Sequence, residues 1–306
     1  MSWFSPCILS MLLIIVYSHI FVSGEICEDR FPQCKDHLDD CLNVPGWMTI
    51  NCPQSCHYCH LRDPKIRCDP TFLNISTIPV ISVGYYNKQF ILLESDHNFK
   101  PLSREPWLLE KENFLTDTEV DQLLALASHW ENSTESGTID AIGEGTQLVV
   151  PSRTSSSFWC IHDCKQQIIV KKIYSRVEAL LNISQNSFEP LQLLRYHKDQ
   201  RYVEHHDYSF QELSLACGPR IMTFFVYLSD VENGGETSFP QLSITVKPKK
   251  GKAIVWANTL DVDPSIKDIR MTHEALPVVE GIKYGANLWI HLNEWLRPSL
   301  WGCTGA

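Results

Sequence analysis

The sequence of 306 residues lacks an excess of basic residues, because 26 Lys and Arg stand against 36 Asp and Glu, for a net charge of −10. A basic face is what binding to nucleic acid requires, so we expect no nucleic-acid partner. A glycine-rich phosphate loop and a G-x-S-x-G motif are also missing. Nucleotide-binding and serine-hydrolase functions are therefore without support.

Long apolar runs are missing too, except at the N-terminus, where residues 8–22 are almost continuously apolar. Such a run is short for a bilayer span but suits a secretory signal, and Ser23 and Gly24 supply small residues for cleavage. We therefore predict a signal peptide over residues 1–24 and a protein of the secretory pathway, either in the endoplasmic reticulum lumen or secreted. No Lys or Arg precedes the run, so an uncleaved membrane anchor is the alternative.

N-glycosylation sequons agree with this topology, and they begin at Asn74, Asn132 and Asn182.

Cysteine is abundant, and six of the 12 cysteines lie between Cys27 and Cys59. A segment this short cannot bury a core that offsets chain entropy, so crosslinks are expected to hold it together. A zinc site is the alternative, because Cys56 and Cys59 have ligand spacing. The secretory leader argues against zinc, because exported cysteines oxidise. The residues alone leave the pairing open.

The stretch Cys52-Pro-Gln-Ser-Cys56-His-Tyr-Cys59, with Trp47-Met48 ahead of it, resembles the ShK toxin-like (ShKT) domain. The resemblance implies a small disulfide-rich module over residues 25–60 with the pairs Cys27–Cys59, Cys34–Cys52 and Cys41–Cys56. His57 stands where channel-blocking members of this family carry Lys before Tyr58, so we favour a tethering or docking role. Residues 61–103 are predicted to be a linker that partly joins the next domain, with brief strands at 80–83 and 90–93. Of the remaining cysteines, Cys160 and Cys164 either pair or stay reduced, and one free thiol is available to link to a partner.

The large domain begins with a helical pattern and continues with strands. Thr116 and Glu119 form a capping box that predicts a helix from about Asp117, and a second helix is predicted over 163–181. The period then changes, and we expect strands at 191–196, 202–208, 221–228, 253–256 and 284–292. This order predicts a mainly β fold, a sandwich or barrel with flanking helices on one face.

The chemistry is concentrated in these strands. His205 and Asp207 are two residues apart and therefore share one face of a strand, whereas His206 is predicted to point away. With His273 as the third ligand, two His and one carboxylate form the facial set of non-haem iron oxygenases. No second His stands four residues after His273, which excludes a zincin. Lys283, amid core-like residues, is a candidate for the buried cation that the distal carboxylate of 2-oxoglutarate requires, and a lysine on the exposed surface of the strand is the alternative.

The segments that carry these residues resemble a prolyl 4-hydroxylase catalytic domain, most specifically in the run Gly234-Gly-Glu-Thr-Ser-Phe-Pro240. The resemblance implies a double-stranded β-helix (jelly-roll, cupin-like) dioxygenase core over residues 104–296, followed by a C-terminal tail over 297–306. It implies an oxidoreductase that hydroxylates peptidyl proline with Fe(II), 2-oxoglutarate, O2 and L-ascorbate. It also implies site roles: iron ligands His205, Asp207 and His273, with Lys283 and Tyr202 at the co-substrate.

The same resemblance implies a proline-containing polypeptide substrate and makes a protein disulfide isomerase-type subunit a candidate partner. Trp256 and Tyr208 are candidate contacts for a proline ring or simply core residues. The alternative function is a secreted binding protein whose ShKT module acts beside a catalytically idle barrel.

Overall fold

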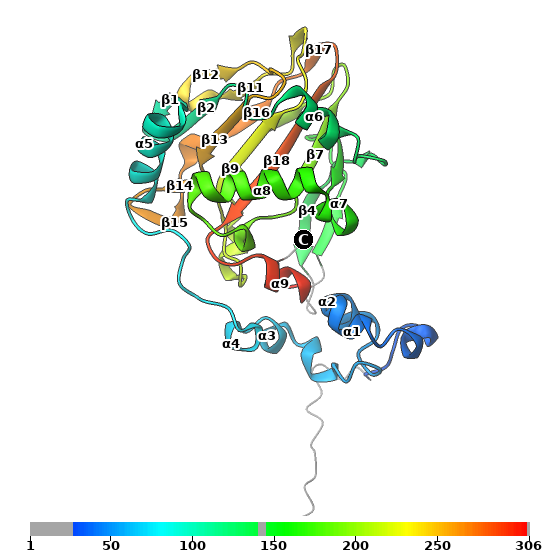
Figure 1. Cartoon of the computed structure of the whole chain (residues 1–306). Helices are drawn as coiled ribbons and strands as arrows, with labels where there is room; N and C mark the ends of the chain where they lie inside the picture. Colours follow the sequence, from blue (N-terminus) through cyan, green and yellow to red (C-terminus); the bar gives the residue numbers. More distant parts are fainter. Residues whose placement is uncertain (1–26, 140–144, 305–306) are drawn as a thin grey trace, which may run out of the picture.

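The computed structural model describes residues 27–139 and 145–304, and it places a small helical module at one end of a large β domain (Figure 1). The predicted signal peptide lies outside the described residues. Within the described part of the chain, no helix combines the length and hydropathy needed to cross a bilayer.

The larger sheet has eight strands, and each neighbouring pair is antiparallel. In spatial order they are β1 (Lys100–Arg104), β2 (Trp107–Lys111), β13 (Ala253–Ala257), β9 (Arg220–Tyr227), β18 (Lys283–His291), β7 (Gln192–Tyr196), β6 (Ser156–Trp159) and β3 (Glu131–Asn132). The two long central strands, β9 and β18, are buried along nearly their whole length. The strands expected near 191–196, 221–228, 253–256 and 284–292 are all confirmed within one or two residues.

A smaller sheet faces the large one and consists of β12 (Ile244–Val246), β11 (Thr237–Phe239), β16 (His273–Ala275) and β8 (Tyr202–His205). Apolar side chains from both sheets form one buried cluster that includes Tyr196, Phe225, Phe239 and Trp256. Strand pairs of two complete the β structure: β4 (Glu135–Ile139) with β5 (Gly145–Leu148), β10 (Asn233–Gly234) with β17 (Val278–Glu280), and β14 (Thr259–Leu260) with β15 (Asp263–Lys267). The predicted mainly β, jelly-roll architecture is confirmed.

Helices cover the outer face of the large sheet, and α8 lies across its central strands (Figure 1). They are α5 (Tyr85–His97), α6 (Asp117–Leu124), α7 (His162–Gln166) and α8 (Ile168–Leu181). The predicted capping box is present at the start of α6. The Thr116 hydroxyl accepts from the Glu119 backbone N–H, and the Glu119 carboxylate accepts from the Thr116 backbone N–H. The second predicted helix is interrupted, because Gln167 has extended backbone angles between α7 and α8. Cys164 in α7 is bonded to Cys160.

The two brief strands predicted within the linker are wrong. Residues 90–93 are helical and belong to α5, and residues 80–83 form turns and bends rather than a strand. Tyr86, Phe90 and Leu93 are buried in the core of the large domain. Their spacing of four and three residues is a helical signal that outweighs the β propensity of Phe, Ile and Leu. β1 then begins at Lys100 as the edge strand of the large sheet.

The module contains short helices and three disulfides, and its buried cluster is Met48 with four half-cystines. The helices are η1 (Pro32–Asp36), α1 (Asp40–Asn43), α2 (Pro45–Asn51) and η2 (Cys59–Arg62). The bonds are Cys27–Cys59, Cys34–Cys52 and Cys41–Cys56, which are the pairs that the ShKT resemblance implies.

The module is attached to the C-terminal end of the large domain. Helices α3 (Pro64–Arg67) and α4 (Pro70–Leu73) follow it, and Cys68 between them is bonded to Cys303, just beyond α9 (Leu296–Leu300). The predicted tail therefore carries α9 and is crosslinked. Among the described residues Cys217 alone is a free cysteine, and it is fully buried, so the predicted link of a free thiol to a partner is wrong.

The remaining short helices are η3 (Gln185–Ser187), η4 (Phe210–Ser214), η5 (Pro240–Leu242) and η6 (Ile269–Met271).

Candidate active site

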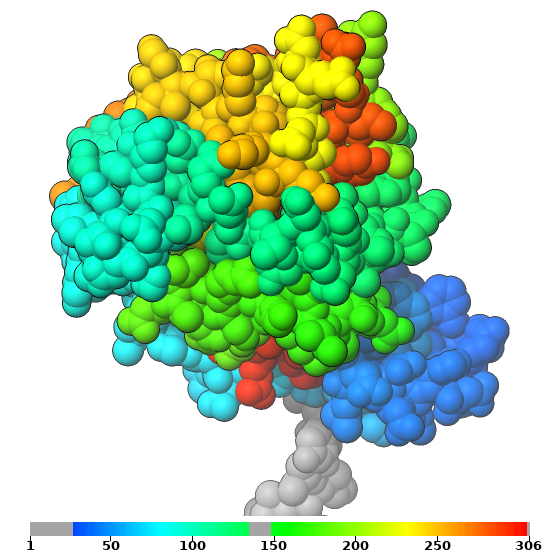
Figure 2. Space-filling view, turned by 45° about the horizontal axis from the view of Figure 1, so that its top comes forward, coloured from blue at the N-terminus to red at the C-terminus, as the bar shows by residue number. Residues whose placement is uncertain are grey.

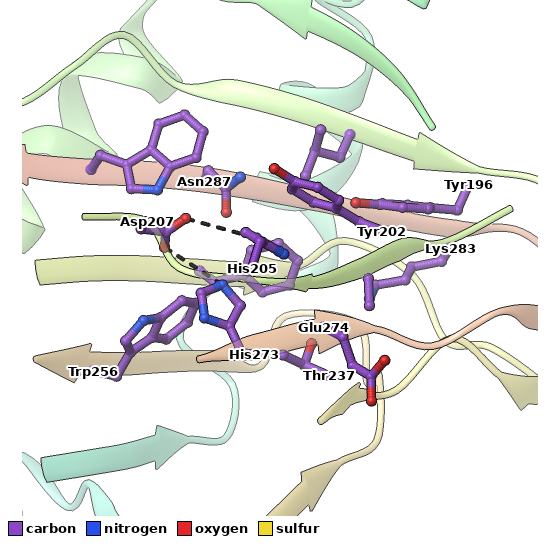
Figure 3. A pocket seen from close by; sticks show the side chains of 14 residues that line it. Tyr196, Tyr202, His205, Asp207, Thr237, Trp256, His273, Glu274, Lys283 and Asn287 are labelled. Carbon is purple, nitrogen blue, oxygen red and sulfur yellow. Dashed lines mark ion pairs between the residues drawn. The ribbon is translucent and has the colours of Figure 1, made fainter. Parts of the chain in front are cut away.

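His205, Asp207 and His273 meet between the two sheets (Figure 3). His205 ends β8 and lies directly opposite His273, the first residue of β16, while Asp207 follows two residues after His205. His205 Nε2 is 3.9 Å from Asp207 Oδ1, and His273 Nε2 is 3.6 Å from Asp207 Oδ2. One potential ligand atom from each residue lies within 4.8 Å of the others, so one metal ion can contact all three.

The two imidazole rings are oriented by identical backbone contacts. His205 Nδ1 is 2.8 Å from the carbonyl oxygen of Val203, and His273 Nδ1 is 2.9 Å from that of Met271. A carbonyl can only accept, so each Nδ1 carries the proton and donates it. Each Nε2 is then left with a free lone pair directed at the shared space, which is the state that binds a metal.

Asp207 is fixed and ionised. The Thr223 hydroxyl donates to Asp207 Oδ2 at 2.6 Å, and the Asn258 amide donates to Thr223 Oγ1 at 3.0 Å. Burial opposes ionisation of Asp207, but the neighbouring His273 and His205 lower its pKa to about 2. Burial also holds the pKa of His205 well below its usual value. The cluster therefore offers neutral imidazole and carboxylate, the forms that bind divalent cations.

His206 points away from this cluster, as strand alternation predicted. Its Nε2 donates to the Asp268 carbonyl at 2.9 Å, and its Nδ1 accepts from the Tyr208 backbone at 3.0 Å. Burial lowers the pKa of His206 to about 4. The predicted strand to Tyr208 is wrong in length, because β8 ends at His205, yet the side chains of His205 and Asp207 still converge.

Lys283 begins β18 and is 1% exposed. Its ammonium lies 5.2 to 5.7 Å from the centres of the Tyr196, Phe225 and Tyr227 rings. Among the described residues it has neither a hydrogen bond nor an ion pair, and burial lowers the pKa of Lys283 to about 7 although Glu236 favours the charged form. A buried ammonium without an anion is costly, so this position favours an anionic ligand.

Lys283 and the His/Asp cluster line one cavity of about 40 Å³. Figure 3 shows Lys283 at one side of it and Trp256 at the other. Tyr202 also lines the cavity and stacks on His205, with ring centres 3.5 Å apart. Trp256 packs against His273 at 4.8 Å. Tyr208 is not among the lining residues, and its hydroxyl instead donates to the Ser265 carbonyl.

The sequence reading missed Asn287 and Trp289, which line the cavity, and Thr223, which holds Asp207. A signal for two of them exists, because residues 283, 287 and 289 are separated by even numbers on one strand and therefore share a face. The indole Nε1 atoms of Trp256 and Trp289 are buried without a hydrogen-bond partner among the described residues. Unpaired donors at the cavity wall are consistent with a polar ligand that fills it.

Comparison with known proteins decides the family. Residues 191–291 match the 2OG-Fe(II) oxygenase superfamily, and residues 26–59 match the ShK domain-like family. Prolyl 4-hydroxylase 2 of Arabidopsis thaliana is 35% identical over 216 residues, which cover 63% of this chain and 70% of that protein.

The chain belongs to the prolyl 4-hydroxylase family. Prolyl 4-hydroxylase subunit alpha-2 of Gallus gallus is 31% identical over 198 residues, and the match covers 63% of this chain but only 36% of that subunit. The solved structure of a viral collagen prolyl hydroxylase from Paramecium bursaria Chlorella virus-1 aligns with a TM-score of 0.46 and 26% identity, over 60% of this chain and 94% of that one. As a member of this family the chain is a dioxygenase that uses Fe(II), 2-oxoglutarate and O2, and ascorbate is typical of the family.

Proposed function

We propose that the chain hydroxylates proline residues of a polypeptide with Fe(II) held by His205, Asp207 and His273 and with 2-oxoglutarate anchored by Lys283. The observation that carries these assignments is the buried ammonium of Lys283, which has no hydrogen bond or ion pair to the residues that the structure describes and lines the same 40 Å³ cavity as the His/Asp cluster. A metal cluster alone fits many enzymes. The added cation selects a co-substrate that is a metal chelator at one end and a carboxylate at the other.

The residues fit iron because three ligands converge from one side. Two neutral imidazoles and one carboxylate would hold the ion from one side and would leave its other side open to co-substrate and oxygen. Thr223 and the carbonyls of Val203 and Met271 hold the three ligands. Such outer contacts set ligand orientation and raise metal affinity.

The residues also fit 2-oxoglutarate. Its keto acid end suits the open iron positions, and its distal carboxylate suits Lys283, which lies at the start of β18. Tyr202, stacked on His205, and Tyr196, beside Lys283, supply aromatic walls for the carbon chain between them. A carboxylate bound there restores the ordinary charge of Lys283, because an adjacent anion opposes the effect of burial.

When bound, iron with 2-oxoglutarate and O2 supplies the oxidation that inserts one oxygen atom into a substrate C–H bond, with succinate and CO2 as co-products. The protein's own tasks are to orient and to exclude water. Trp256, Phe225 and Leu194 wall the cavity with apolar surface. Such walls keep the reaction from bulk solvent and limit side reactions.

The competing function is an idle barrel beside a binding module. A barrel that had lost catalysis would not be expected to keep the complete ligand set, the threonine that supports it and the buried lysine. The test is release of CO2 from labelled 2-oxoglutarate by the purified chain with Fe(II) and proline-containing peptides, with mass spectrometry of the peptides. Peptide-dependent release with one oxygen gained on proline is expected, and release without peptide oxidation, or none, contradicts the proposal.

We further propose that the enzyme works in the secretory pathway. Five disulfides among the described residues support an oxidising compartment. The three sequon asparagines Asn74, Asn132 and Asn182 are exposed, which glycosylation requires. A shift in mobility after endoglycosidase treatment of the secreted or lumenal protein is expected. Co-purification from that compartment would test the protein disulfide isomerase-type partner in the same experiment.

A further inference from the structure

The ShKT module carries an exposed groove walled by two aromatic rings. Phe31 and Trp47 stack with ring centres 5.9 Å apart and planes within 7°, yet they are 45% and 53% exposed. Together with Gln33, His37 and Asp40 and the Cys34–Cys52 bond they line a hollow of about 320 Å³. These rings lie outside the module's buried cluster, so about half of each side chain is available to a ligand.

We propose that this groove binds a proline-rich, lysine- or arginine-bearing segment of the same polypeptide that the large domain hydroxylates. This inference rests on the proposed function, because the substrate of a prolyl hydroxylase contains proline. Aromatic-lined grooves bind proline-rich chains in the polyproline II form, which is already ordered and therefore loses little entropy on binding. Ring-to-ring stacking leaves flat faces on which pyrrolidine rings pack.

The charge beside the groove selects the flanking residues of that segment. Asp40 lines the groove, and Asp36 and Asp39 are close to it in sequence, whereas the basic residues near the lining residues in sequence are Arg30 and Lys35. An excess of carboxylates attracts a basic segment and repels an acidic one. The groove is therefore expected to prefer proline segments that carry Lys or Arg.

The groove lies at the end of the large domain toward which the catalytic strand runs. β18 carries Lys283 at its start and Trp289 near its end, and it leads into α9 (Figure 1). The module's α2, which carries Trp47, contacts α9. Figure 2 shows the module as a separate lobe at this end of the large domain. A chain bound in the groove is therefore held beside the domain that contains the reacting site.

The attachment between module and domain is close. A Cβ built on Gly46 would come within 2.7 Å of the Gly302 nitrogen, so the backbones of α2 and the C-terminal segment pack without room for a side chain. The Trp301 ring contacts Tyr58 of the module at 5.5 Å and Phe72 of α4 at 4.9 Å. The Cys68–Cys303 bond crosslinks the same junction. The groove and the active site are thus held in one arrangement, which allows one substrate chain to occupy both.

The test compares two peptides on the full-length enzyme loaded with Fe(II) and 2-oxoglutarate. The short peptide carries one target proline. The long one has about 30 residues with repeated proline and lysine, and at ~3.1 Å per residue it reaches ~90 Å in the polyproline II form. That exceeds the ~50 Å diameter expected for a folded chain of this size.

Trp47→Ala is expected to raise KM for the long peptide by about tenfold, as loss of an aromatic anchor does, and to leave kcat and the short peptide unchanged. Phe31→Ala should act in the same way. Asp40→Asn should reduce the preference for the lysine-bearing long peptide over a lysine-free one. The matched control is Leu42→Ala, because Leu42 is 84% exposed but does not line the groove.

Three results would overturn the proposal. One is an unchanged KM for the long peptide in both aromatic variants, and another is equal loss on both peptides, which would make the groove a structural support. A third is conversion of a dimer to a monomer by Trp47→Ala, which would assign the groove to a second copy of the chain. Calorimetric binding of the long peptide without iron keeps this test separate from failure of the hydroxylase itself.

Discussion

The module and the large domain solve the problem of stability in different ways. The apolar cluster inside the module is Met48 with four half-cystines, and the module exposes Phe31, Leu42 and Trp47. The large domain packs two extensive apolar clusters between sheets and helices, and within it only Cys160–Cys164 crosslinks the described residues. Crosslinks act mainly by restricting the unfolded chain, whereas a core acts by removing apolar surface from water.

The difference explains where each part places its functional groups. A large core can tolerate buried polar groups that lower stability, and the domain holds Asp207, His273 and Lys283 at 7%, 5% and 1% exposure. A module without such a core cannot bury a reactive cluster, but its crosslinks allow it to leave aromatic rings on the surface. The reactive side chains therefore lie in the interior of the large domain, and the proposed binding surface lies on the exterior of the module.

Reduction is the most direct way to break this comparison. Dithiothreitol should unfold the module, since each native disulfide of a small domain contributes ~2–5 kcal/mol, while the large domain stays folded. Hydrogen exchange measured by mass spectrometry should show loss of protection in residues 27–62 and retention in β9 and β18. Before reduction, the module cysteines should resist alkylation. Labelling of Cys27, Cys41 or Cys59 in the native protein would contradict the account.

Substitution of single histidines tests the part of the comparison that concerns the large domain. His205→Ala should lower iron affinity and turnover by more than ~100-fold, because removing a ligand costs more than removing its outer support. His206→Ala is the matched control and should keep most activity, because that ring bonds the Asp268 carbonyl on the far side. Iron content and peptide hydroxylation are measured for both variants. The reverse pattern would show that the ligand assignment is wrong.

Lys283→Ala should raise KM for 2-oxoglutarate by ~100-fold or more while iron content is maintained, because a buried carboxylate would lose its charge partner. Lys198→Ala, at an exposed position, is the control. An unchanged KM would remove Lys283 from the site.

The pH dependence of 2-oxoglutarate binding gives a finer test of Lys283. The pKa of Lys283 is about 7 without a ligand, so the ammonium that binds carboxylate is present below pH 7 and is lost above it. Affinity for 2-oxoglutarate should therefore fall as pH rises through 7, by up to about tenfold per pH unit. Titration of binding across this range checks the sign, and Lys283→Ala should abolish the dependence.

The smallest expected effect is that of Thr223→Val, which keeps the shape but removes the hydroxyl that donates to Asp207. Iron affinity should fall by ~10-fold, the usual cost of losing an outer contact to a ligand. Thr245→Val, exposed on β12, should change nothing. Iron titration distinguishes the two, and equal affinities would show that Thr223 does not hold the carboxylate.

Particular residues show how far sequence reading reached. The capping box at Thr116, the central strands and the shared face of His205 and Asp207 all follow from local periodicity, and each was predicted. Helix α5 was missed because short apolar runs fit helix and strand alike. Tyr86, Phe90 and Leu93 resolve the choice only when their burial against the large sheet is known. The break at Gln167 was missed because neither Pro nor Gly marks it in the sequence. The Cys160–Cys164 bond closes a short loop just before it.

By itself the sequence determined which chemistry is available, because it contains two histidines, a carboxylate and a lysine in predicted strands. It also determined that one short segment is stabilised by disulfides rather than by a large apolar core. Only the tertiary structure decided that His273 pairs with His205 across 68 positions of chain and that Cys68 meets Cys303. It also decided that Lys283 has no anionic partner within the described part of the chain. Periodicity and capping are carried by neighbouring residues, so they can be read along the chain. Pairing between distant residues depends on which packing of all the elements buries the most apolar surface. That total area is a property of the whole fold and is not encoded in any short stretch of sequence.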